Sequence, residues 1–337
     1  MNKDLTPSEP NSFAEIAKLI QDRRARVVRA VNTELIDLYW EIGKILSHKV
    51  ELAEWGRGTV TELANFLKRT EPGIKGFSAS NLWRMRQFHE TYRHNEKLAP
   101  LVRQLPWSSN LLILGQAKSA EEREFYLQLT AQEGWSRREL DRQFKAALFE
   151  RKILSPPQIA PAVRELHSGA GQVFRDSYVV EFLGLDDEHS EADLHKGLLK
   201  HLRKFLTELG RDFCFIGSEH PIQVGKQDFA LDLLFFHREL NCLVAIELKV
   251  SRFEPEHLGK LNFYLEALDR DIKKEHENPS IGLLLCASKD DEVVEYALSR
   301  SLSPSLIAQY ETKLPDKALL QKKLHEFLEL SQKEEVV

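Results

Sequence analysis

The chain has 337 residues, of which 42% are hydrophobic and 29% charged, an ordinary composition for a globular protein long enough to form two cores. Its apolar runs have the length of strands and its N-terminal stretch lacks a signal peptide's apolar region, so we expect neither a membrane span nor secretion. Cys214, Cys242 and Cys286 fall in predicted strands without CxxC spacing. They indicate buried thiols in a cytoplasmic protein, and exclude a disulfide framework or a zinc site.

The net charge of −5 hides an uneven distribution. Residues 1–160 carry 25 Lys and Arg against 20 Asp and Glu, whereas residues 161–337 carry 22 against 32. A mildly basic half beside an acidic half is consistent with a DNA-docking module next to a carboxylate-rich metal site. The same excess of positive charge also fits a solvated helical surface.

The first half of the chain has helical periodicity. Ser12 can cap a helix with Glu15 three residues later, and a second helical stretch covers about residues 32–46. Further helices are predicted over residues 121–129 and 136–152. These patterns predict an all-helical N-terminal domain over residues 12–153.

Within this domain, a helix over residues 59–70 is followed by a turn with Pro72, Gly73 and Gly76, and then by a helix that Ser78 caps. The second helix presents Arg84 and Arg86 on its polar face. Helix, turn and basic helix together are typical of a helix-turn-helix, although this turn is longer than usual. We expect Arg84 and Arg86 to contact nucleic acid; an ordinary pair of packed helices is the alternative.

A linker is predicted over residues 154–172, which hold three prolines and two glycines. The second domain, residues 173–337, begins with a helix capped by Ser190 and continues with strands over 213–216, 227–237 and 243–250. A helix from Pro255 to about residue 269 follows, then a strand over 281–287, a helix over 290–300, a strand over 305–310 and a closing helix over 317–330. This order predicts an α/β fold with a mixed sheet.

Two of these strands carry the residues that point to a function. If residues 238–241 form a four-residue loop, His237 pairs with Cys242 and Asp232 lies opposite Glu247, on a strand that also carries Lys249. Facing carboxylates repel each other, so they need a cation, and a divalent metal is the natural candidate. A structural ion pair between Lys249 and one acid is the alternative, because Glu-x-Lys alone also occurs at residues 311–313.

One spacing resembles the signature of PD-(D/E)XK nucleases: Asp232 is followed, after fourteen residues, by Glu247-Leu248-Lys249. The words GKQDFALDLLFFH, AIELK, GKLNFYLEALD and IGLLLCASKDDEVVEYAL resemble the YhcG-type branch of that superfamily. The likeness extends into the N-terminal half through the segments WEIGKIL, GFSASNLWRMRQFHETY and EREFYLQLTAQEGWSRRELDRQF. The resemblance implies a helix-turn-helix or winged-helix-like N-terminal domain and a restriction-endonuclease-like C-terminal domain.

The resemblance also implies a chemistry: a Mg²⁺-dependent endonuclease, with Mn²⁺ able to substitute, whose expected substrate is DNA. Asp232, Glu247 and the carbonyl of Leu248 would ligate the metal, because carboxylate and carbonyl oxygens are hard ligands. Lys249 would serve the attacking water or the phosphate.

Further residues are expected near this centre. Glu191 lies on the same helical row as His195 and can face inward as a further catalytic acid, or can simply complement the helix dipole. Relatives carry a second acid where His195 stands, which leaves the complete metal shell open. Four residues are expected to flank the pocket, where they can touch phosphate or have a structural role: Gln227, Asp228, Lys260 and Tyr264.

The rival hypothesis is a catalytically inactive nucleic-acid- or protein-binding component with a vestigial nuclease fold and ion-paired acids. The presence of Asp232, Glu247 and Lys249 together favours the enzyme. DNA against RNA, the substrate's structure and the biological role stay open, as does assembly into a homo-oligomer.

Overall fold

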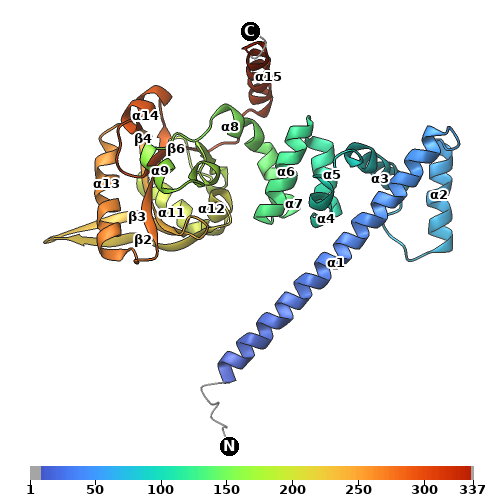
Figure 1. Ribbon diagram of the computed structural model, residues 1–337, viewed down its shortest axis with the longest axis horizontal. Helices are drawn as coiled ribbons and strands as arrows, with labels where there is room; N and C mark the ends of the chain where they lie inside the picture. Colours follow the sequence, from blue (N-terminus) through green and yellow to red (C-terminus); the bar gives the residue numbers. More distant parts are fainter. Residues whose placement is uncertain (1–8, 335–337) are drawn as a thin grey trace, which may run out of the picture. The chain divides into compact units, whose positions relative to one another are not determined.

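The computed structural model describes residues 9–334, and side chains over residues 13–330. These residues form two compact units, up to Asp141 and from Arg142 onward (Figure 1). The division falls inside a helix, α7 (Arg137–Lys145), and precedes the predicted linker. Over the described residues, no helix is both long and apolar enough to cross a membrane.

The first unit is helical, as the periodicity predicts. Its helices, in chain order, are α1 (Glu9–Glu51), α2 (Arg57–Thr70), α3 (Ala79–Tyr92), α4 (Ala99–Gln104), α5 (Trp107–Gln116) and α6 (Ala120–Glu133). Ser78 caps α3 by accepting a hydrogen bond from the backbone N–H of Asn81, as expected from the sequence. Leu82, Met85 and Phe88 of α3 are buried. The two helices predicted on either side of the turn are therefore present as α2 and α3.

One helix of the first unit differs from its prediction. The two stretches expected from residue 12 to 46 are a single helix, α1, of 43 residues. Its C-terminal half packs against α3 at Gly43, where a Cβ would collide with the carbonyl of Met85. At the point where a break was expected, the amide of Asn32 donates to the carbonyls of Arg103 and Leu105. The helix thus continues because tertiary contacts hold its middle in place.

The second unit is built on a mixed sheet of six strands within the described residues, in the order β1-β6-β5-β4-β3-β2. The strands are β1 (Ser177–Val179), β2 (Phe213–Val224), β3 (Gln227–His237), β4 (Cys242–Arg252), β5 (Asn278–Ser288) and β6 (Ser305–Glu311). The pairs β2–β3 and β3–β4 are antiparallel, and β4–β5, β5–β6 and β1–β6 are parallel. The α/β fold with a mixed sheet is therefore confirmed.

The helices of this unit supply the rest of its core. They are α8 (Leu148–Leu154), α9 (Pro161–Leu166), α10 (Ala170–Val173), α11 (Glu191–Lys200), α12 (Leu202–Leu209), α13 (His257–Ala267), α14 (Asp291–Leu298) and α15 (Lys317–Glu334), with short turns at Glu181–Leu183 and Leu268–Ile272. Buried residues of α11, α12 and α13 join those of the sheet in one hydrophobic cluster.

The segment 154–172, for which the sequence predicts a linker, forms α9 and α10 in this unit. Ala160, Val163 and Ala170 belong to the hydrophobic core, and the N–H of Ala160 donates to the carbonyl of Ser305 on β6. Pro161 starts a helix instead of marking an extended connection, because it occupies the first turn of α9. This part of the chain therefore packs as an element of the second unit.

The cysteine prediction is only partly correct. Cys242 and Cys286 are buried, whereas Cys214 is exposed, because it lies on β2 at the edge of the sheet. All three are free thiols.

Candidate active site

The site forms where β3 and β4 separate. His237 pairs with Cys242, so the hairpin has the register that the sequence predicts, and the pairing runs as far as Leu233 with Ile246. Asp232 and Glu247 are one step beyond that last pair. There the Asp232 Oδ2 accepts a hydrogen bond of 2.8 Å from the backbone N–H of Leu248. Beyond the last backbone pair, the carboxylate of Asp232 therefore accepts the hydrogen bond of a β4 N–H that would otherwise go to a backbone carbonyl.

Glu247 is fully buried on β4, a central strand of the sheet. Its Oε1 contacts the ammonium groups of Lys260 at 2.5 Å and Lys249 at 3.4 Å. Its Oε2 is buried without a hydrogen-bond partner among the described residues. Burial, and next the charge of Asp232, raise the pKa of Glu247 against the opposing effect of the two lysines. A carboxylate held in this way favours a cation on its open oxygen.

Lys249 connects the strand to helix α11. Its Nζ donates to the carbonyl of Leu248 at 2.9 Å and lies 3.2 Å from the Oε1 of Glu191. Ser190 and Asp193 form the capping box that starts α11, which places Glu191 in the first turn. Glu191 therefore reaches the site, as the helical row predicts, and it does so through Lys249.

His195, which lies on the same row of α11 as Glu191, contacts the backbone. Its Nε2 donates to the carbonyl of Asp232 at 3.2 Å. A ring nitrogen that donates in this way is not free to ligate a metal. His195 thus holds the strand that carries Asp232.

Of the residues expected to flank the pocket, Lys260 on α13 contacts Glu247. Burial alone would lower the pKa of Lys260, but its hydrogen bond to Glu247 and the charge of that acid outweigh it and raise the pKa. The ammonium also lies 5.4 Å from the ring of Tyr264, whose hydroxyl donates to the carbonyl of Ala230. Gln227 and Asp228 are exposed at the far end of β3, away from these contacts.

The donor set can be compared with the needs of a divalent cation. Among the residues with described side chains, no group of three or more His, Cys, Asp and Glu is arranged to hold a metal ion. Mg²⁺ does not require such a group, because it keeps several waters and takes one or two carboxylates. Asp232, the open Oε2 of Glu247 and the carbonyl of Leu248 supply hard oxygen atoms of the right kind, so the residues fit.

The two arginines expected to contact nucleic acid differ in their surroundings. Arg86 is partly buried, its Nε donates to Glu90 at 2.7 Å, and its guanidinium lies 5.3 Å from the ring of Trp83. Arg84 is exposed and has no ion-pair partner within residues 13–330. Of the two, Arg84 is the more accessible to a phosphate.

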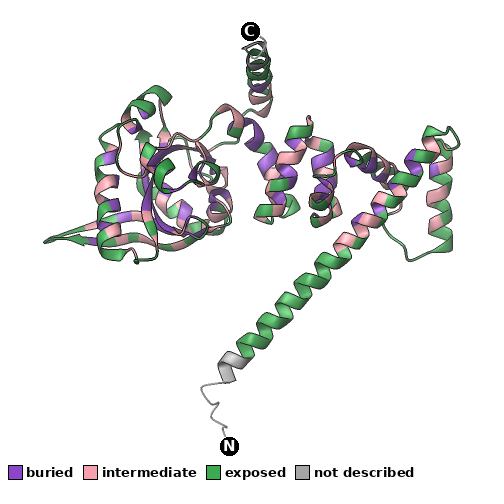
Figure 2. Cartoon of the chain, in the orientation of Figure 1, coloured by how far each residue is buried: buried purple, intermediate pink, exposed green. Residues whose placement is uncertain are grey.

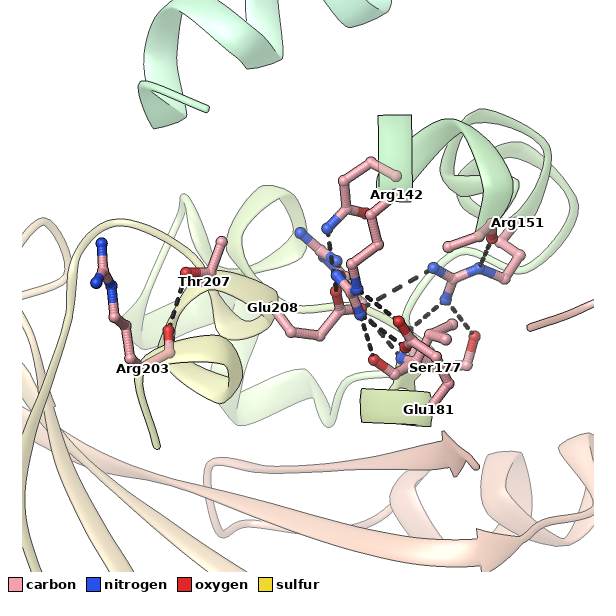
Figure 3. Close-up of polar contacts among 11 residues, drawn as sticks. Arg142, Arg151, Ser177, Glu181, Arg203, Thr207 and Glu208 are labelled. Atoms are coloured by element: carbon pink, nitrogen blue, oxygen red, sulfur yellow. Dashed lines mark hydrogen bonds and ion pairs between the residues drawn. The ribbon is translucent and has the colours of Figure 1, made fainter. Parts of the chain in front are cut away.

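A second charged cluster, for which the local sequence has no signal, lies in the second unit around Glu208 of α12 (Figure 3). Glu208 is fully buried and lies 2.9 Å from both Arg142 and Arg175, and 4.0 Å from Arg151. Burial alone would raise the pKa of Glu208, but the charges of the three arginines hold it at about 2. In an amphipathic pattern such a residue is assigned to the solvent face, so helical spacing could not reveal it. Glu208 therefore has a structural role and lies outside the candidate active site.

Comparison with known proteins gives the family. The model of the YhcG PDDEXK nuclease domain matches residues 171–325, and that of the DUF1016 N-terminal domain matches residues 15–151. The protein YhcG of Escherichia coli (strain K12) is 35% identical, and the match covers 90% of this chain and 90% of the relative.

Two solved structures have a low similarity. One is a repair endonuclease from Pyrococcus abyssi, 17% identical with a TM-score of 0.26, and the other is EndoMS in apo form, 16% identical with a TM-score of 0.24. Each match covers 39% of this chain, and 50% and 49% of the respective solved chains. The family assignment depends instead on the two domain models and the Escherichia coli relative: the chain belongs to the YhcG family of PD-(D/E)XK nucleases.

Proposed function

We propose that this chain is a Mg²⁺-dependent endonuclease that hydrolyses phosphodiester bonds in DNA, with Mn²⁺ able to replace Mg²⁺. The main support is the buried carboxylate of Glu247, with an open Oε2, next to Asp232 where the strands part. Asp232, Glu247 and the carbonyl of Leu248 would hold the ion. When bound there, a divalent cation supplies positive charge to the scissile phosphate.

Lys249 is the residue we assign to the reacting groups. Its ammonium is held between Glu191 and Glu247 and is 16% exposed, so it is positioned but accessible. From there it can donate a hydrogen bond to the attacking water or to a phosphate oxygen, and stabilise the negative charge that develops in the transition state. Glu191 would position Lys249, and Lys260 would position Glu247 or bind an adjacent phosphate.

Docking of DNA is assigned to the first unit, through Arg84 on α3 and the excess of positive charge in residues 1–160. Binding through phosphate contacts should weaken steeply as salt rises. We expect a fragment of residues 1–141 to bind DNA in this way, and Arg84→Glu to reduce the affinity. Arg84→Lys, which keeps the positive charge at the same exposed position, is the control and should bind like wild type. A fragment without salt-dependent binding would argue for a protein interface instead.

A second candidate function is a binding component without catalysis. It is favoured by one observation: both Lys249 and Lys260 already contact Glu247, which is the arrangement of a structural ion pair. In that case the acids stabilise the fold, and added metal should change nothing.

The two functions and the substrate class are separated by one assay. Purified protein is incubated with supercoiled, linear, single-stranded and branched DNA, and with RNA, in Mg²⁺, Mn²⁺ or EDTA. Cleavage of a DNA substrate that EDTA abolishes supports the proposal. Cleavage of RNA alone would correct the substrate, and absence of cleavage in every condition would favour the binding component.

A further inference from the structure

The first half of α1 has no packing partner among the described residues of its own unit. Every residue from Phe13 to Val31 is exposed, and Figure 2 shows this part of the helix in green beyond the other helices of its unit. An isolated helix gains nothing from packing and is marginal in water. Its exposed residues nevertheless include Phe13, Ile20, Val27 and Val31, each at least 50% accessible.

These apolar residues lie on one stripe along the helix. Positions alternately four and three residues apart along α1 are Phe13, Ala17, Ile20, Arg24, Val27, Val31, Glu34, Leu38, Glu41 and Ile45. Each of them is exposed, including Leu38 and Ile45 in the half of α1 whose other face packs against α3. This spacing is that of the buried positions of a coiled coil, sustained over more than four heptads.

We propose that this stripe pairs with the same stripe of a second copy of the chain, in an antiparallel coiled coil. The charges at its buried positions select this partner and direction. In a parallel pair in register, Arg24 would face Arg24 of the second copy, and Glu34 would face Glu34 of the second copy. Both contacts bring like charges together in a region that excludes water, which is unfavourable.

The antiparallel arrangement removes both conflicts. With Val27 placed opposite Val31 of the second copy, Arg24 faces Glu34 of the second copy, and the symmetry of the pair produces this contact twice. The same register places Phe13 opposite Ile45 and Ile20 opposite Leu38. Glu41 faces the small Ala17, which leaves space for its carboxylate to reach solvent.

Other antiparallel registers are less favourable. A shift by one heptad in either direction places Glu34 opposite Ala17 or Val31 and shortens the overlap of the stripes. The described register aligns the whole stripe, over about 50 Å of helix. Self-association through an isologous contact is also the commonest form of protein dimer.

The test is the mass of the full-length protein in solution, measured by light scattering during gel filtration or by sedimentation. Wild type should be a dimer, and Val27→Glu with Val31→Glu should be a monomer. Leu19→Glu with Ala25→Glu adds the same two carboxylates to the opposite side of α1 and should leave the dimer intact. All four residues are exposed in the single chain, so the variants should fold; melting curves check this.

Direction is tested by charge reversal. Arg24→Glu or Glu34→Arg alone should raise the dimer dissociation constant about tenfold, equivalent to about 1.4 kcal/mol. The two substitutions together should restore it, because they exchange the partners of an antiparallel contact; in a parallel pair they would not. A monomeric wild type, a dimer that survives Val27→Glu with Val31→Glu, or a failure of the combined variant to recover would overturn the proposal. So would a monomer that uses this stripe to bind anionic vesicles.

Discussion

Asp232 and Glu247 show how two residues can be inferred from spacing while their contacts cannot. The four-residue loop and the alternation of the strands predict the register of the hairpin, which is confirmed by the pairing of His237 with Cys242. The opening of the strands at Asp232 could not be predicted, because its carboxylate replaces a backbone partner. The contact between Lys260 and Glu247 joins elements distant in sequence and has no local signal.

The raised pKa of Glu247 leads to a prediction about stability. A carboxyl group with a raised pKa in the folded state destabilises the protein once it ionises, so stability falls as pH rises through that pKa. Asp232→Asn removes one cause of the shift and keeps an oxygen for the N–H of Leu248. We therefore expect Asp232→Asn to leave the metal-free melting temperature at neutral pH unchanged or higher, and to reduce this loss of stability with pH.

Added metal should stabilise wild type more than the Asp232→Asn variant. Binding to the native state stabilises by about 2.7 kcal/mol at a hundred times the dissociation constant, and Asp232→Asn should lose most of this gain. Asp228→Asn, an exposed acid on the same strand, is the control. If Asp232→Asn instead costs about 3–5 kcal/mol in EDTA, and metal does not affect wild type, the acids form a structural ion pair.

At the scale of elements, the strands and most helices follow from periodicity, and the exceptions have tertiary causes. The sequence predicts one helix over residues 136–152, but the chain has a break at Ala147, which adopts a left-handed conformation with φ of 49°. The Nε of Arg151 donates to the carbonyl of Ala146 at this break. Arg142 and Arg151, on either side of it, both lie beside Glu208. No pattern in the local sequence indicates that the helix must break so that two arginines can reach Glu208.

Glu208 should therefore hold the segment from Arg142 to Arg151 in the second unit. Its depressed pKa contributes stability that is present above its ordinary value of 4.5 and is lost as pH falls toward about 2. Glu208→Gln leaves three arginines without their buried counter-charge, so we expect a loss on the order of 3–5 kcal/mol at neutral pH. The variant should also show less loss of stability in acid.

Urea unfolding of both proteins as a function of pH measures this effect. The control is Glu329→Gln, which changes an exposed acid on α15 and should leave the free energy of unfolding unchanged. A Glu208→Gln protein as stable as wild type at pH 7 would show that the arginines do not depend on this carboxylate.

At the scale of the whole chain, the division into two units predicts which fragment folds. A fragment of residues 142–337 keeps Arg142 and Arg151 with Glu208, whereas residues 155–337 lack both. We expect the longer fragment to unfold cooperatively and the shorter one to be much less stable or insoluble. Circular dichroism melts compare the two, and equal stability would contradict the structural importance of the segment before residue 155.

Glu247 is the residue proposed to serve metal-dependent hydrolysis, and the chain contains a control for this role. Glu311 and Lys313 repeat the Glu-x-Lys spacing at the end of β6, outside the site. The most direct measurement is the rate of DNA cleavage in Mg²⁺ by wild type, Glu247→Gln and Glu311→Gln, with DNA affinity determined in EDTA. If Glu247 serves metal-dependent hydrolysis, Glu247→Gln should lose at least about 10²-fold in rate with unchanged affinity, and Glu311→Gln should cleave like wild type. A Glu247→Gln protein that cleaves as fast as wild type would contradict this role.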